Sequence, residues 1–213
     1  MKLTESKIIF FTRIFLAAIY LIGVIGISIP SFSSLYVQIT PVTLLISGLL
    51  LLAFHEPWNR NSILTFLFIL AIGFIIEVFG VSTGKIFGAY SYSEILGPKV
   101  LDVPLIIALN WLILVYGAYY IASYFFKHQL LRLVIGGILL VVFDLIMEPV
   151  AIELNMWTWE AGMPPFQNYV VWFVASAAMM SFFPLFRLKL KNPVATALFV
   201  YLVLFFGILN FIV

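Results

Sequence analysis

The chain has 213 residues, of which 64% are hydrophobic and only 9% are charged, with a formal net charge of +2. A soluble domain carries about 25% charged residues, so this composition excludes a soluble globular protein and requires lipid as the main solvent. The chain has no Cys, which excludes disulfides, iron–sulfur clusters and thiolate chemistry, and its two His are too few for a histidine-rich di-iron site. Nothing indicates nucleic-acid binding, and the length fits a single integral membrane domain over residues 1–213.

Seven apolar segments, taken in chain order, are candidates for membrane helices, each of which needs about 20 mainly apolar residues. They cover 8–29, 37–54, 62–81, 103–126, 132–152, 168–186 and 193–213. The first is too long for the apolar part of a signal peptide, and no small-x-small cleavage site follows it, so we expect it to be the first membrane helix. The sequence therefore predicts an all-α, multi-pass bundle of about seven transmembrane helices in the cell (inner) membrane.

The Lys and Arg residues indicate the orientation of this bundle. If the N-terminus is cytoplasmic, nine of the eleven lie at or near the inner side, namely Lys2, Lys7, Arg13, Arg60, Lys127, Arg132, Arg187, Lys189 and Lys191. Lys85 and Lys99 then lie outside. We therefore predict a cytoplasmic N-terminus and an external C-terminus. The two long connections, 82–102 and 153–167, fall on the outer side with most of the polar and aromatic loop residues, so a working site is expected there.

Three carboxylates interrupt the outer halves of two predicted helices. Glu77 lies near the end of segment 62–81, and Asp144 and Glu148 lie four residues apart in segment 132–152, so these two share a helix face. A carboxylate within hydrocarbon is costly, and no Lys or Arg lies deep in this half to pair with one. Glu77 and Glu148 could reach interfacial water, and Asp144 could make a structural hydrogen bond. We favour a functional cluster in which a buried carboxyl serves as a general acid.

The first long connection combines glycine with aromatic residues. Gly80, Gly84 and Gly88 recur every four residues, which suits either close helix packing or a backbone that bends sharply. Phe87, Tyr90 and Tyr92 follow in the same loop. Asn110 and Trp111 lie about two turns into the next predicted helix, on the same outer half.

The second long connection is rich in tryptophan and proline. Trp157 and Trp159 suit either an interfacial aromatic belt or a site. The pair at 164–165 cannot lie inside a regular helix, so this loop is expected to be stiff and to fold over the mouth of the bundle. Asn168 and Trp172 open the next helix on the same side. Pro149, directly after Glu148, is expected to mark where that helix loosens toward the loop.

A further polar stretch, "FHEPWNR" at 54–60, contains His55 and Glu56 but lies on the inner side, away from the three acids. We interpret it as a capped turn at the membrane surface rather than as a site.

An ordered set of residues between about 73 and 185 resembles the membrane carotenoid biosynthesis protein family, which includes carotenoid 1,2-hydratases of the γ-carotene and bisanhydrobacterioruberin type. The set comprises Glu77-x-x-Gly80, Thr83-Gly84-x-x-Phe87-Gly88-x-Tyr90-x-Tyr92, Leu96-Gly97-Pro98, Val103-Pro104, Trp111, Asp144-x-x-x-Glu148-Pro149, Trp157-x-Trp159, Pro164-Pro165, Asn168 and Trp172. The first, second and seventh predicted helices carry no part of it.

The resemblance implies a cofactor-independent hydratase that adds water to the terminal carbon–carbon double bond of an acyclic (ψ) carotenoid end group, giving a tertiary alcohol. No metal or redox cofactor is implied. The implied partners are membrane lipid, a long hydrophobic polyene, water and other enzymes of carotenoid biosynthesis.

The residue roles that we expect follow from this chemistry. Asp144 is our candidate proton donor because it is the deepest acid, and Glu148 and Glu77 would relay the proton, stabilise the cation or orient water. The expected substrate-binding residues are Phe87, Tyr90, Tyr92, Asn110, Trp111, Trp157, Trp159, Asn168 and Trp172.

Two other functions suit the same acids. A carotenoid cyclase of the lycopene type also begins with protonation of the alkene, but leaves the product mass unchanged. A small proton-coupled transporter would also place acids within the membrane. The absence of a visible inverted repeat in the sequence argues against the transporter.

Overall fold

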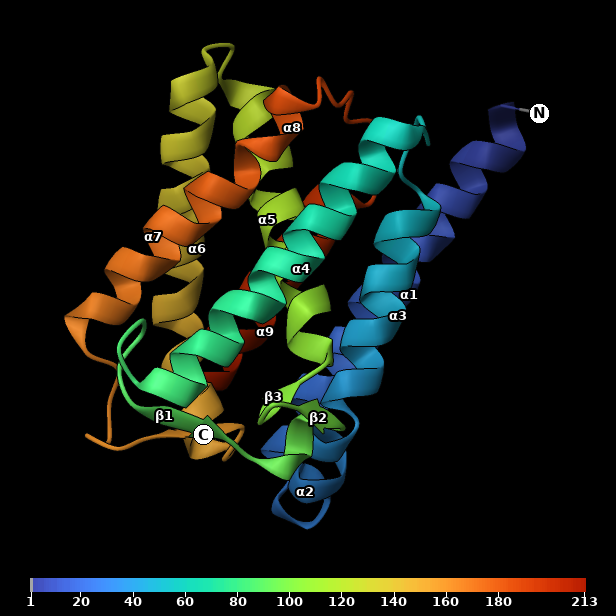
Figure 1. Ribbon diagram of the computed structural model, residues 1–213. Helices are drawn as coiled ribbons and strands as arrows, with labels where there is room; N and C mark the ends of the chain where they lie inside the picture. The colour runs from blue at the N-terminus through green and yellow to red at the C-terminus, as the bar shows by residue number, and fades with distance from the viewer. Residues whose placement is uncertain (1) are drawn as a thin grey trace.

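The computed structural model describes residues 2–213 as a helical bundle whose long helices run alternately between two ends (Figure 1). The long helices are α1 (Lys2–Ser28), α3 (Thr40–Ala53), α4 (Arg60–Thr83), α5 (Ile106–Phe125), α6 (Gln129–Glu153), α7 (Phe166–Met180) and α9 (Ala195–Leu209). The short helices α2 (Pro30–Gln38), α8 (Phe182–Leu185) and the 3-10 helix η1 (Glu94–Leu96) connect them. Each of the predicted membrane segments therefore contains a helix, and the two termini lie at opposite ends (Figure 1).

The chain is a multi-pass membrane protein. Among residues 2–213, five helices are long and apolar enough to cross a bilayer, which are α1, α4, α5, α6 and the stretch formed by α7 and α8. Helices α2 and α3, bent by 49° at their junction, would make a sixth span if they cross together. Helix α9 has 15 residues, which is about 22 Å and shorter than the hydrocarbon core of roughly 30 Å. A count of seven spans and the orientation of the termini therefore stay predictions.

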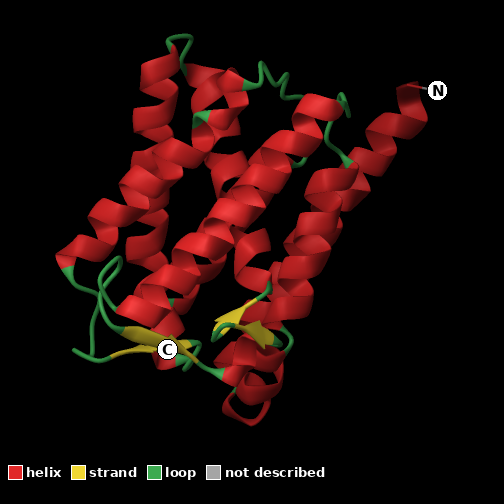
Figure 2. Cartoon of the chain, viewed as in Figure 1, coloured by secondary structure: helices red, strands yellow, loops and turns green. Residues whose placement is uncertain are grey.

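The prediction of an all-α fold was incomplete, because four short strands lie at one end of the bundle (Figure 2). Strand β1 (Tyr90–Tyr92) pairs antiparallel with β4 (Trp157–Trp159), and β2 (Lys99–Val100) pairs with β3 (Val103–Pro104). The turn between β2 and β3 consists of Leu101 and Asp102, both with positive φ, as a two-residue hairpin turn of type I′ requires. The strands have only two or three residues, which is too short to form a period in an apolar sequence.

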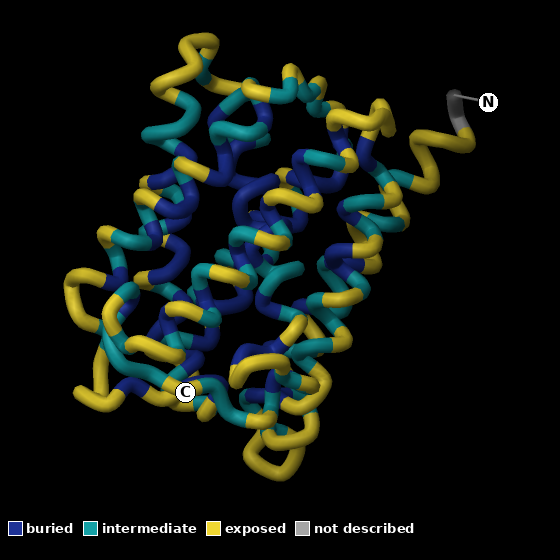
Figure 3. Tube along the Cα trace, viewed as in Figure 1, coloured by how far each residue is buried: buried dark blue, intermediate teal, exposed yellow. Residues whose placement is uncertain are grey.

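Helix α5 lies at the centre of the bundle and contacts α3, α4, α6, α7 and α9. Its residues from Trp111 to Ala118 are buried, whereas the outer helices bury one side and expose the other (Figure 3). Large apolar side chains such as Phe11, Leu49 and Phe79 lie exposed on that outer side. Such a surface fits hydrocarbon rather than water.

Pro149 does not loosen α6, and that prediction was wrong. The helix continues through Pro149 to Glu153. Pro149 has no N–H, so the carbonyl of Leu145, four residues earlier, loses its usual donor, which is costly within a membrane. Asn210, directly after α9, donates its side-chain amide to the adjacent carbonyl, that of Ile146. A side chain from the end of α9 thus supplies a hydrogen-bond donor one residue from the carbonyl that the proline leaves without one.

The stretch at 54–60 forms the capped turn that the sequence predicts. The side chain of Asn59 accepts a hydrogen bond from the backbone N–H of Ser62 at 2.9 Å, and the Ser62 hydroxyl accepts one from the backbone N–H of Asn59 at 2.9 Å. This reciprocal pair is a capping box at the start of α4. Glu56 forms an exposed ion pair with Lys191, 2.6 Å between Oε2 and Nζ.

Candidate active site

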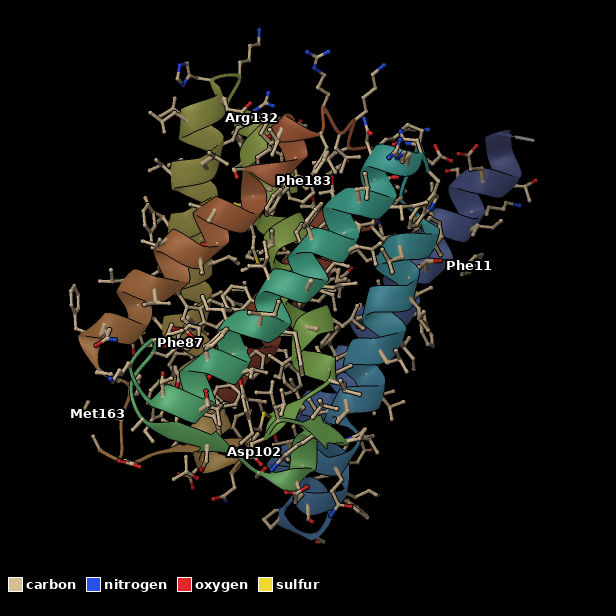
Figure 4. The ribbon with its side chains drawn as sticks, in the orientation of Figure 1. Phe11, Phe87, Asp102, Arg132, Met163 and Phe183 are labelled. Carbon is tan, nitrogen blue, oxygen red and sulfur yellow. The ribbon has the colours of Figure 1, made fainter. Side chains whose placement is uncertain are left out.

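The three acids lie toward the same end of the bundle, opposite the end that carries Arg132 (Figure 4). From the helix rise, Glu77 lies about 9 Å before the end of α4, Glu148 about 8 Å before the end of α6, and Asp144 about 14 Å before that end. Glu77 and Glu148 are each 4% exposed, and Asp144 is 0% exposed. Neither Glu is therefore an interfacial carboxylate that reaches freely into water.

Glu77 is surrounded by hydrogen-bond donors. Its Oε2 accepts from the hydroxyls of Tyr90 at 2.5 Å and Tyr92 at 2.8 Å. Its Oε1 accepts from the indole N–H of Trp111 in α5 at 2.9 Å. Three side-chain donors on one carboxyl are the pattern expected around an acceptor-only, ionised carboxylate.

Glu148 also accepts from aromatic donors, but on one oxygen. Its Oε2 receives the indole N–H groups of Trp157 at 3.1 Å and Trp159 at 2.9 Å. Within the part of the chain that the structure describes, Oε1 has no hydrogen-bond partner, yet it is not among the fully buried unpaired atoms. Oε1 is therefore the acid oxygen available to another molecule.

The pairing of β1 with β4 explains why these donors converge. Tyr90 lies opposite Trp159 and Tyr92 lies opposite Trp157. Side chains alternate along a strand, so these four aromatic residues face the bundle while the residues between them, Ser91 and Thr158, are exposed. The sequence predicts all four aromatic residues as part of the site but does not predict the sheet. The alternation in "YSY" and "WTW" covers only three residues in each strand, which is too few to distinguish a strand from a loop.

The glycines of the first long connection let that loop approach the helices. A Cβ on Gly80 would lie 2.7 Å from the Phe87 ring and 3.0 Å from the Tyr90 hydroxyl, so this glycine makes room for the loop rather than for another helix. Gly84 ends α4 with a φ of 62°, and Gly88 has a φ of 119°. The recurrence therefore serves the close approach of the loop at Gly80 and a bent backbone at Gly84 and Gly88, not helix–helix packing.

Asp144 is held by Asn168, whose amide donates to Oδ2 at 2.6 Å. Its other oxygen, Oδ1, is buried with no partner among the described residues. The hydrogen bond joins α6 to α7, as the structural alternative for Asp144 predicts. Asp144 shares a helix face with Glu148, one turn away.

A small cavity of about 30 Å³ lies between Glu77 and Glu148. It is lined by Glu77, Phe87, Tyr90, Tyr92, Ile107, Asn110, Trp111, Met147, Glu148, Trp157, Trp159, Asn168 and Trp172. One water occupies about 10–15 Å³ by this measure, so the cavity has room for one or two. The structure thus brings all nine predicted substrate-binding residues together with two of the three acids. Asp144 is not on the cavity wall, whereas Ile107 and Met147, which were not predicted, are.

The tyrosines of β1 are suited to act as donors. Burial raises the pKa of Tyr90 well above its ordinary value, and the neighbouring Glu77 raises it further. The pKa of Tyr92 is raised for the same reasons. Both hydroxyls therefore keep their protons at neutral pH. Among the residues that the structure describes, no group of three or more His, Asp or Glu side chains is placed to hold a metal ion.

The fold and the site define a class: a multi-pass membrane protein with acids buried in its helical bundle under a lid of aromatic hydrogen-bond donors. The family model for "carotenoid biosynthesis protein" matches residues 38–213, and the chain belongs to this family. The chain is also 30% identical over 118 residues to a bisanhydrobacterioruberin hydratase from Haloarcula japonica. That match covers 51% of this chain and 40% of the relative, so the chain spans less than half of the relative's length. No solved structure matches. Family membership supports a carotenoid-modifying role.

Proposed function

We propose that the chain hydrates the terminal double bond of an acyclic carotenoid end group. The observation that carries this proposal is the small cavity, which has room for one or two waters and lies between Glu148 and Glu77. An alkene that is not activated by a carbonyl needs a proton from a strong acid before water can add. The site combines an acid, a second carboxylate and space for water within an apolar bundle.

Glu148 is the proton donor in this proposal. Its Oε1 has no hydrogen-bond partner among the described residues, and its side chain lines the cavity. Asp144 lies one turn deeper, off the cavity wall, so it cannot meet the alkene in this arrangement. We assign Asp144 the role of a positioning residue that acts on Glu148 from the same helix face and is held in place by Asn168.

The reaction balances as follows. The carboxylic acid proton of Glu148 bonds to the less substituted alkene carbon as the π bond breaks, which leaves a tertiary carbocation and the Glu148 carboxylate. Water bonds to the cation through oxygen and loses one proton to Glu77, and that proton returns to Glu148 through water in the cavity. The net change is the addition of one water. The ionised Glu77 and the rings of Trp111 and Trp172, stacked 4.4 Å apart, stabilise the positive charge.

The hydratase named among the relatives supports hydration over cyclisation, and so does a cavity that admits water to the acids. A cyclase must instead exclude water from the same cation. The two activities therefore differ in what reaches the cation, not in how it forms.

The test is expression of the chain in a host that accumulates an acyclic carotenoid, followed by mass analysis of the pigments. We expect a product heavier by one water. Replacing Glu148 by Gln should lower its yield by at least about 100-fold, since general acids contribute roughly 10²–10⁴. Glu153→Gln, at the end of the same helix and away from the cavity, is the matched control and should keep full yield. A cyclised product of unchanged mass would indicate the cyclase, and flux without chemical change would indicate a transporter.

The same assay separates the two acids of α6. Asp144→Asn should reduce the yield less than Glu148→Gln does, because the new side-chain amide can still form a hydrogen bond with Asn168. If the Asp144 variant loses all product while the Glu148 variant keeps it, Asp144 is the donor after all.

A further inference from the structure

A second and larger cavity, of about 330 Å³, lies beside the acid site. Its walls come from α1, α2, α3, η1, α5, α6, β4 and α9, and its lining is almost entirely apolar. It shares Ile107, Asn110, Met147 and Trp157 with the small cavity, so these residues separate the two spaces. A molecule in the large cavity would therefore reach the acid site past these four side chains.

Asn110 is the polar group at this junction. It is partly exposed, and its side-chain amide makes no hydrogen bond with any residue that the structure describes. An amide at the wall of an apolar cavity loses free energy unless a ligand or water satisfies it. Asn110 thus marks the end of the large cavity at which a polar group or a water is expected.

The other side of the large cavity opens toward lipid. Ile22 in α1, Ile39 at the bend between α2 and α3, and Val42 in α3 all line it and are 51%, 41% and 54% exposed. These residues lie on the outer surface, where hydrocarbon surrounds the bundle. A long apolar chain could therefore enter from the membrane without crossing water.

We propose that this cavity holds the last two to three isoprene units of an acyclic polyene, with the terminal double bond at Asn110 and the rest of the chain in the membrane. This inference rests on the proposed hydratase function and assigns its binding site. A cavity of about 150 Å³ accommodates one benzene, so 330 Å³ accommodates roughly 13 carbons. The two ends of one polyene cannot occupy the site together. A reaction at both ends would therefore take two separate binding events.

A side chain that fills the cavity tests the proposal. Thr43 in α3 lines the cavity, whereas Leu45 in the same helix is exposed and does not. Thr43→Trp should block the isoprene units, and Leu45→Trp should place the same ring in lipid. Ile46→Phe fills the same cavity with a smaller change and serves if Thr43→Trp does not fold.

The measurement uses purified protein in phospholipid nanodiscs with lycopene as the acyclic probe. We expect bound pigment, measured by absorbance per protein, to fall at least about ten-fold for Thr43→Trp and to stay unchanged for Leu45→Trp. Equal lycopene binding by both variants would overturn the proposal and would leave the cavity to a lipid acyl chain.

The proposed binding site and the proposed hydratase function can be refuted independently of each other. Lycopene that binds with this pattern but gives no hydrated product would refute the hydratase function and keep the binding site. Hydrated product that Thr43→Trp and Ile46→Phe both form at the full rate would refute the binding site and keep the hydratase function.

Discussion

The two ends of the bundle both bury polar side chains, but they use them differently. At the end where α4 and α6 finish, five aromatic donors converge on two carboxylates, namely Tyr90, Tyr92 and Trp111 on Glu77 and Trp157 and Trp159 on Glu148. None of these hydrogen bonds involves a backbone group. All the donors to Glu77 and Glu148 are side chains, so each can be removed by a single substitution, and both acids border the small cavity.

At the opposite end the polar groups hold the chain together. His55 is buried, with Nδ1 2.8 Å from the Tyr116 hydroxyl, and the amide of Asn192 donates to the backbone carbonyl of Leu51 at 2.7 Å. A cavity of about 410 Å³ also lies here, but its charged residues include the exposed pair Glu56 and Lys191. Buried polar groups alone therefore do not make a site. What distinguishes the first end is that two of its buried acids, Glu77 and Glu148, line a cavity.

The strongest test of this contrast is Glu77→Gln against Glu56→Gln. In the first variant the new amide oxygen can still accept from Trp111 and its NH₂ can face the tyrosine hydroxyls, so the fold should survive without the negative charge. We expect a loss of about 100-fold or more in hydration rate, since charge stabilisation of this kind is worth roughly 10²–10³. Glu56→Gln, at the other end, should leave the rate unchanged. Equal hydration rates for the two variants would show that Glu77 has no role in the reaction.

A smaller effect is expected for Trp159→Phe, which removes one of the two donors to Glu148 and keeps an aromatic ring beside Tyr90. This hydrogen bond strengthens as Glu148 becomes a carboxylate in the transition state, and a hydrogen bond to a charged group contributes about 1.5–3 kcal/mol, so the rate should fall by roughly ten-fold to 100-fold. The measurement is product formed per folded protein. Thr158→Val, on the exposed side of the same strand, should not change the rate.

For Tyr116→Phe we expect a loss of stability without a loss of hydration rate. The variant leaves His55 without its partner in a buried position, which should cost about 1–3 kcal/mol of stability. The rate per folded molecule should stay the same, because Tyr116 lies more than a helical turn along α5 from Trp111 and does not line the acid cavity. Thermal unfolding in detergent combined with the hydration assay measures both. A large loss of rate at full stability would contradict the division between the ends.

The sequence was sufficient to predict the helices, the shared end of the acids and the residues around them. The length of a membrane helix follows from its run of apolar residues, and the depth of a residue in it follows from the rise per residue, so both can be derived from the sequence. The β1–β4 sheet was missed because its strands are short and lie in two separate connections far apart in sequence, so their pairing depends on the fold. The separation of Asp144 from the cavity was missed for a related reason. The four-residue spacing places Asp144 and Glu148 on one helix face. Which of the two lines the small cavity depends on the neighbouring α7, whose Asn168 binds Asp144.

The smallest expected effect is a pH dependence of stability at the end away from the acids. Burial lowers the pKa of His55 below its ordinary value of 6.5. The unfolded chain then takes up a proton near pH 6.5 while the folded chain does not, so this contribution to stability is present above that pH and is lost as the pH falls toward the folded pKa. The slope is at most about 1.4 kcal/mol per pH unit for one group. Thermal unfolding at about pH 7.5 and about pH 5.5, on either side of the ordinary His pKa, should show the loss, and His55→Gln should reduce it. If His55→Gln keeps the full pH dependence of stability, the proton binds at another group. The polar cluster around His55 would then be structural without being sensitive to pH.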